Sequence, residues 1–156
     1  MRLIQYDDDY VFFLNRLYIK NIDFDNNKDV TNYINGVLKK ISDCYHIQLK
    51  GFYKIYVYIN EIYGIILEVM KMDDYGDYDV DSVDLKIIIK NKSKFFLETS
   101  NYDIVKNMKE FYLSNNKYYF DIKYIINDFN KYIEHFDIIY KDIDKKVMKA
   151  NKIRRD

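Results

Sequence analysis

The 156-residue chain contains no proline, no tryptophan, one cysteine and four glycines. With Cys44 alone, no disulfide can form within the chain, and such sparing use of cysteine is typical of reducing compartments. The glycines stand singly at 36, 51, 64 and 76. The sequence therefore lacks both the glycine-rich dinucleotide fingerprint and the phosphate-binding P-loop, and it excludes a disulfide-stabilised scaffold.

Long uncharged apolar stretches are also missing. The chain reaches Asp7, Asp8 and Asp9 before an apolar signal-peptide core could form. No window approaches the 18 apolar residues that a transmembrane helix requires. Lysine plus arginine equals aspartate plus glutamate at 25 each, so the net charge favours neither nucleic acid nor a membrane as a partner. We expect a cytoplasmic protein that does not bind membranes.

Aromatic residues, in contrast, are abundant, with 18 tyrosines and 10 phenylalanines. Isoleucine, lysine, asparagine and aspartate are also frequent, so residues with A/T-rich codons dominate, which indicates an A/T-rich genome. A tyrosine-rich binding surface is the alternative interpretation. Hydrophobic residues make up 49% of the chain, and its length fits a single domain over 1–156 with its own core.

The clearest predicted helix begins after Asn26, whose side chain can cap it. Apolar residues then recur at helical spacing from Val30 to Tyr45, with Gly36 as an unfavourable residue in the middle. Before this helix, aromatic and β-branched residues predict a strand over 10–19, bent near Asn15.

Two hairpins are predicted after the helix. The runs 52–59 and 63–70 alternate around a tight turn, and both faces of this pair are apolar or aromatic, as in strands covered on both sides. The runs 85–89 and 95–97 make the second predicted hairpin. The aspartate-rich segment 73–84 that separates the hairpins is expected to be a solvated loop.

Further helices are predicted over 103–112, 125–136 and 141–156, with a strand over 118–122. Hairpins combined with segregated helices indicate an α+β fold. We expect a mostly antiparallel sheet of about five to six strands, including two hairpins, packed with three to four helices.

No catalytic constellation is recognisable in the sequence. Cys44 and His46 lie two residues apart, so on a helix their side chains would point in different directions. Two histidines and one cysteine cannot supply a conventional structural zinc site. We therefore predict a non-enzymatic protein without a cofactor, although an active site assembled by tertiary structure stays open.

The aspartate-rich segment is the candidate for a hard cation. Asp77, Asp79 and Asp81 match the opening of a calcium-binding loop, but Ser82 replaces its turn glycine and Ile88 its bidentate glutamate. A solvated loop is the favoured interpretation. Weak divalent-cation binding and docking of a basic partner are the alternatives.

The C-terminal segment 141–156 carries the main excess of basic charge. It carries seven basic residues and three aspartates, a net charge of seven minus three, or +4. The candidate interaction residues are Lys145, Lys146, Lys149, Lys152, Arg154 and Arg155. A solvated tail that stabilises its own helix is the alternative, because cations near a helix C-terminus interact favourably with the macrodipole.

Tyr56 and Tyr58 are the last candidate residues, since they share a predicted strand face with Lys54. Aromatic side chains beside cations can stack single-stranded bases. Taken together, the sequence predicts a small regulatory or adaptor protein that acts through protein–protein interaction. The alternative is a nucleic-acid-binding protein that uses the basic C-terminal segment and exposed tyrosines. Self-association through the acidic and basic segments is also open.

Overall fold

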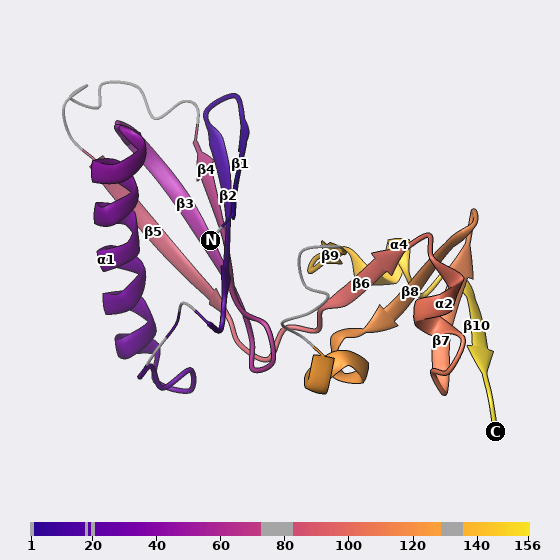
Figure 1. Ribbon diagram of the computed structural model, residues 1–156. Helices are drawn as coiled ribbons and strands as arrows, with labels where there is room; N and C mark the ends of the chain where they lie inside the picture. The colour runs from indigo at the N-terminus through magenta and orange to yellow at the C-terminus, as the bar shows by residue number, and fades with distance from the viewer. Residues whose placement is uncertain (1, 18, 20, 73–82, 129–135) are drawn as a thin grey trace. The chain divides into compact units, whose positions relative to one another are not determined.

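The computed structural model describes residues 2–17, 19, 21–72, 83–128 and 136–156. The chain divides into two compact units, Met1–Lys92 and Ser93–Asp156, each with its own five-stranded sheet (Figure 1). The α+β class and the mostly antiparallel pairing are confirmed, but the described residues form ten strands in two sheets where the sequence predicted one sheet of five to six. That the whole chain acts as one domain stays a prediction.

The described residues of the first unit form one helix and five strands: β1 (Arg2–Tyr6), β2 (Asp9–Asn15), α1 (Asn27–Tyr45), β3 (Gly51–Asn60), β4 (Gly64–Lys71) and β5 (Val83–Lys90). The order across the sheet is β1-β2-β4-β3-β5. Neighbouring strands are antiparallel except β3 and β5, which run parallel with Ile55 opposite Ile87. The predicted 52–59 and 63–70 hairpin is thus confirmed as β3 and β4.

Helix α1 covers one face of this sheet (Figure 1). Its predicted cap is confirmed, because the Asn26 side chain accepts hydrogen bonds from the backbone N–H groups of Lys28 and Asp29. Its buried stripe is Val30, Ile34, Val37, Leu38 and Ile41. This stripe packs against alternate residues of β2, β3 and β4, among which Ile55, Val57, Ile65 and Leu67 are fully buried. Apolar residues that recur about every 3.6 positions on the helix therefore contact apolar residues at every second position on the strands.

The opposite face of the sheet carries the other alternate residues. Tyr56 and Tyr58 of β3 are half-buried there. Glu68 of β4 lies between them and β2, since its cross-strand neighbours are Val11 and Tyr56, and it is 6% exposed. Of the helices and strands described in this unit, α1 is the one helix, and it packs on the other face.

The predicted hairpin of 85–89 with 95–97 is wrong. β5 pairs with β3 in the first unit, whereas β6 (Phe96–Thr99) pairs with β8 and β9 in the second. The reason lies in burial: Leu85, Ile87 and Ile89 extend the apolar face under α1, while Phe96 packs in the core of the second unit. The predicted strand over 10–19 likewise ends at Asn15, whose side chain accepts a hydrogen bond from the backbone of Leu17.

The second unit is built on the antiparallel sheet β10-β7-β8-β6-β9. Its elements after β6 are α2 (Tyr102–Val105), β7 (Glu110–Ser114), β8 (Lys117–Asp121), the 3-10 helix η1 (Ile122–Asp128), β9 (Asp137–Ile139), α4 (Ile143–Lys146) and β10 (Asn151–Arg154). Phe96, Tyr112 and Tyr119 pack with Val147 on one face. The alternate residues face the other way, where Phe111 contacts Tyr118 edge-on.

The predicted helix over 103–112 is replaced by the short helix α2 and by β7. Asn115 and Asn116 explain the change, because both adopt positive φ angles, of 49° and 60°. Two such residues make the type I′ turn that joins twisted antiparallel strands, and asparagine tolerates this conformation. The turn brings Ser114 opposite Lys117 and makes β7 and β8 a hairpin.

Two other predicted helices also differ from the structure. The segment 125–136 begins within η1, and its residues 129–135 lie outside the described part of the chain. The segment 141–156 contains the four-residue helix α4 and then the strand β10, so the predicted C-terminal helix is wrong. β10 instead alternates, with Ile153 opposite Phe111 and Lys152 opposite Tyr112.

Two glycines provide a matched test of this backbone. Gly36 lies in α1, where an added Cβ would meet no neighbouring residue within 4 Å, whereas Gly64 has φ +123° and a Cβ there would lie 2.5 Å from the Leu14 carbonyl oxygen. We expect Gly36→Ala to stabilise the protein by about 0.5–1 kcal/mol and Gly64→Ala to destabilise it by about 1–3 kcal/mol. Urea unfolding checks both signs, and equal midpoints for the two variants would contradict the described backbone.

Alkaline pH provides a second test through Tyr63, which is 3% exposed. Burial raises the pKa of Tyr63 well above its usual value near 10, although the charge of Arg2 opposes the shift. Above about pH 10 the unfolded chain loses the Tyr63 hydroxyl proton while the folded chain keeps it, so the free energy of unfolding falls as the pH rises. We expect Tyr63→Phe to flatten the fall in denaturation midpoint above pH 10, and exposed Tyr6→Phe to leave the slope unchanged.

Candidate interaction site

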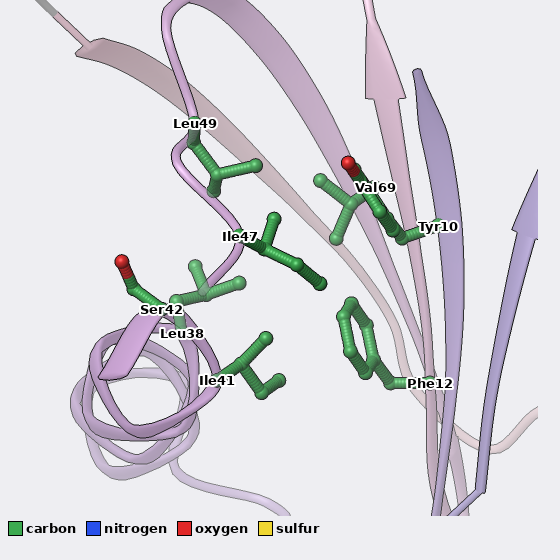
Figure 2. A pocket seen from close by; sticks show the side chains of 8 residues that line it. All are labelled: Tyr10, Phe12, Leu38, Ile41, Ser42, Ile47, Leu49 and Val69. Atoms are coloured by element: carbon green, nitrogen blue, oxygen red, sulfur yellow. The ribbon is translucent and has the colours of Figure 1, made fainter. Parts of the chain in front are cut away.

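A small cavity lies beside the C-terminal half of α1 (Figure 2). Its walls are Leu38, Ile41 and Ser42 of the helix, Ile47 and Leu49 of the following segment, and Tyr10, Phe12 and Val69 of the sheet. It encloses about 10 Å³, the lower limit for one water molecule. Two hydroxyl groups in an apolar wall of this size cannot hold a substrate, so this cavity is not a candidate active site.

The described residues also lack a group of three histidine, cysteine, aspartate or glutamate side chains that could hold a metal ion. Cys44 is exposed in the last turn of α1, and His46 ends that helix in a left-handed conformation with φ 53°. Asp77, Asp79 and Asp81 lie outside the described residues. None of the described helices is long and apolar enough to cross a bilayer.

The six predicted interaction residues of the C-terminal segment divide into two groups, and the first has partners within the second unit. Lys152 and Arg154 project from β10 toward Glu110 of β7, with nitrogen–oxygen distances of 3.0 and 3.5 Å. The hydrogen bond from Lys152, together with the charges of Lys152 and Arg154, lowers the pKa of Glu110. One carboxylate therefore pairs with two of the predicted interaction residues, and the Arg154 side chain remains 72% exposed.

Arg155 belongs to the same engaged group. Its guanidinium donates a hydrogen bond of 2.6 Å to the Tyr102 hydroxyl and lies 5.4 Å from the centre of the Phe111 ring. Its backbone N–H donates to the carbonyl of Lys109, which continues the pairing of β10 with the chain before β7. Arg155 therefore anchors the end of the strand through cation–π and hydrogen-bond contacts.

The second group consists of Lys145, Lys146 and Lys149, which we call the α4 lysine cluster. All three side chains are exposed. In the part of the chain that the structure describes, none of the three forms an ion pair or a side-chain hydrogen bond. Met148, between them, is 46% exposed.

The α4 lysine cluster stands on a fixed base. Val147 is fully buried against Tyr112 and Tyr119, and Ile143 and Ala150 pack beside it. The backbone N–H of Val147 donates to the Ile143 carbonyl at 2.7 Å, and that of Ala150 donates to Val147 at 2.9 Å. The apolar side of this segment thus faces the sheet, and its lysines face outward.

Tyr56 and Tyr58 lie in the first unit, on the sheet face away from α1. Tyr56 is opposite the carboxylate-bearing Glu68 on one side and Ile88 on the other. Tyr58 is opposite Ile66 and Lys90. The two tyrosines are half-buried in a sheet surface, and a carboxylate beside Tyr56 opposes the approach of a phosphate backbone.

Comparison with known proteins finds no match to the chain among family models, curated proteins or solved structures.

Sequence reasoning missed the contacts of Glu110, which decide how the basic segment is used. The available signal was the alternation of Lys152, Ile153 and Arg154, which suits an edge strand with one face toward a core. This alternation was overlooked because the apolar residues of the same lysine-rich segment also fit a loose helical spacing. Glu110 itself fell inside the predicted 103–112 helix, where it had no assigned partner.

The role of Glu110 is open to a direct test. Glu110→Gln removes the charge that holds Lys152 and Arg154, so we expect tryptic cleavage after these two residues to become several-fold faster. Glu98→Gln is the matched control, since Glu98 pairs with Lys117 in the same sheet, away from β10. Equal cleavage of both variants and the unchanged protein would contradict the assignment.

Proposed function

We propose that this chain is a small cytoplasmic regulatory or adaptor protein, without enzymatic activity, that binds an acidic segment of another protein through the α4 lysine cluster. The observation that supports it is the division of the basic residues. Lys152, Arg154 and Arg155 have partners inside the second unit, whereas Lys145, Lys146 and Lys149 face solvent from a base anchored by Val147. Three adjacent cations at one fixed place favour a ligand of opposite charge.

A protein partner fits this surface better than a nucleic acid. Binding to a phosphate backbone draws on many cations, and arginine is well suited to it because its fork binds phosphates bidentately. Here both C-terminal arginines have partners, and the exposed carboxylates of Asp142 and Asp144 adjoin the lysines. Exposed Met148 adds an apolar contact, which an acidic peptide with apolar residues can use.

The magnitude expected for such binding is modest. Exposed ion pairs contribute about 0.2–1 kcal/mol each, so three pairs contribute about 0.6–3 kcal/mol. Screening by salt weakens exposed pairs, because the Debye length falls to about 8 Å at physiological ionic strength. An interaction that is weak, reversible and sensitive to salt suits a regulatory or adaptor role.

The test uses fluorescence anisotropy with a labelled 16-residue peptide of alternating glutamate and leucine pairs, and with single-stranded RNA and DNA of equal charge. We expect the full chain to bind the peptide more tightly than either nucleic acid. The variant K145E/K146E/K149E should bind the peptide about tenfold more weakly, because three ion pairs become repulsive contacts.

The matched control is K28E/K39E/K40E, which makes the same change in net charge on the exposed side of α1. This variant should bind the peptide nearly as the unchanged protein does. Equal weakening by both triple variants would mean that net charge alone matters, and the proposed site would be wrong. If RNA or DNA bound more tightly than the peptide, the proposed protein partner would be wrong and a nucleic-acid partner would be supported.

A further inference from the structure

Strand β5 is an open edge of the first sheet. Among the described residues its one strand partner is β3, to which it is paired over eight consecutive positions from Val83 to Lys90. An edge strand presents unpaired backbone N–H and C=O groups on its outer side, which can pair with another strand. β5 is also the longest edge strand described, since β1 has five residues, β10 four and β9 three.

Among the described residues, the side chains on one face of β5 pack against the core beneath α1. Leu85, Ile87 and Ile89 pack against the core under α1, yet each remains partly exposed, and Val83 is 47% exposed. Their counterparts on β3, one strand further in, are fully or almost fully buried. A further strand beside β5 would remove this remaining apolar surface from water.

The order of charged residues along β5 indicates which strand could pair with its open edge. The residues on the face away from α1 are Asp84, Lys86, Ile88 and Lys90, with the acid near the start and a base at the end. A second β5 running antiparallel and centred on Ile87 places Asp84 opposite Lys90 of the second copy, and this contact occurs twice. It also places Leu85 opposite Ile89 and Ile87 opposite itself, so apolar residues meet on the α1 face.

Other arrangements of two such strands are less favourable. A parallel pair in register sets Asp84 against Asp84 and Lys90 against Lys90. Centring the antiparallel pair on Lys86 opposes that lysine to itself, and centring it on Ile88 opposes Lys86 to Lys90. Like charges directly opposite each other destabilise a strand pair, whereas opposite charges stabilise it. Centring the pair on Leu85 also sets Asp84 opposite Lys86, but this register overlaps only the five positions 83–87. The register centred on Ile87 overlaps the seven positions 84–90 and is therefore the longest one that pairs opposite charges on this face.

We propose that two copies of the chain associate through antiparallel pairing of β5 with β5, centred on Ile87, so that two five-stranded sheets become one ten-stranded sheet. The occupant of this edge is a second copy of the same chain. The proposal is independent of the α4 lysine cluster, which lies in the other unit.

The test is a charge exchange followed by analytical ultracentrifugation of the full chain. Asp84→Lys or Lys90→Asp alone turns two attractive contacts into repulsive ones, so each should raise the dimer dissociation constant by roughly tenfold or more. The double variant D84K/K90D restores opposite charges and should return the constant to within a few-fold of the original. Circular dichroism of every variant establishes that the fold is retained, and the double variant corrects for contacts that Lys90 makes within its own chain.

Three results would overturn the proposal. One is a chain that remains monomeric at a concentration of about 1 mM, because a dimer with a dissociation constant of about 1 mM or less would be populated there. Another is a dimer that both single variants leave unchanged, which would place the interface elsewhere. The third is a double variant as weak as the single variants, since specific pairing of residues 84 and 90 requires rescue. K145E/K146E/K149E should dimerise normally, which separates this test from that of the proposed function.

Discussion

The packing of α1 on one face of β3 and β4 is the interaction on which the first unit depends. Residues at alternate positions of these strands are fully buried beneath the helix stripe, and each such aliphatic side chain stabilises the fold by about 1.5–3 kcal/mol. The residues that alternate with them along β3 and β4 point to the other face of the sheet, away from α1. On that face Tyr56 and Tyr58 are half-buried, whereas Ile66 and Glu68 of β4 are buried.

This one-sided packing also explains the position of β5. Its apolar residues complete the face beneath α1, so the strand pairs with β3 and not with β6. The strand remains at the edge with its charges arranged from acid to base. The same burial requirement that fixed the fold has therefore left a surface whose backbone and charges suit a second copy of the chain.

In the second unit, electrostatic contacts add to the backbone pairing of β10 with β7. Glu110 pairs with Lys152 and Arg154, and the Tyr102 hydroxyl accepts a hydrogen bond from Arg155. Because the pKa of Glu110 is lowered in the folded chain, this contribution is present above the usual carboxyl pKa near 4.5 and is lost as the pH falls below it. The basic segment thus contains three residues with partners inside the unit and three without a partner among the described residues, and its total charge does not measure its binding surface.

Strong local periodicity predicted α1, its Asn26 cap and the β3–β4 hairpin, because a helix stripe and strand alternation depend on neighbours in sequence. The pairing of β5 with β3, the conversion of 103–112 into α2 and β7, and the strand β10 could not be predicted in this way. They depend on partners distant in sequence, such as Glu110 for Lys152, or on the left-handed conformations of Asn115 and Asn116. The candidate residues were found from composition, but their division into engaged and exposed groups required the tertiary contacts.

The division of the basic residues is the central claim, and lysine-by-lysine acetylation rates measured by mass spectrometry test it most directly. In the free protein, Lys145, Lys146 and Lys149 should react quickly and Lys152 slowly, since Lys152 is hydrogen-bonded to Glu110. Adding the acidic peptide should protect the three fast lysines and leave the rate of Lys152 unchanged. Equal rates for all four lysines, or protection of Lys152 together with the others, would contradict the account.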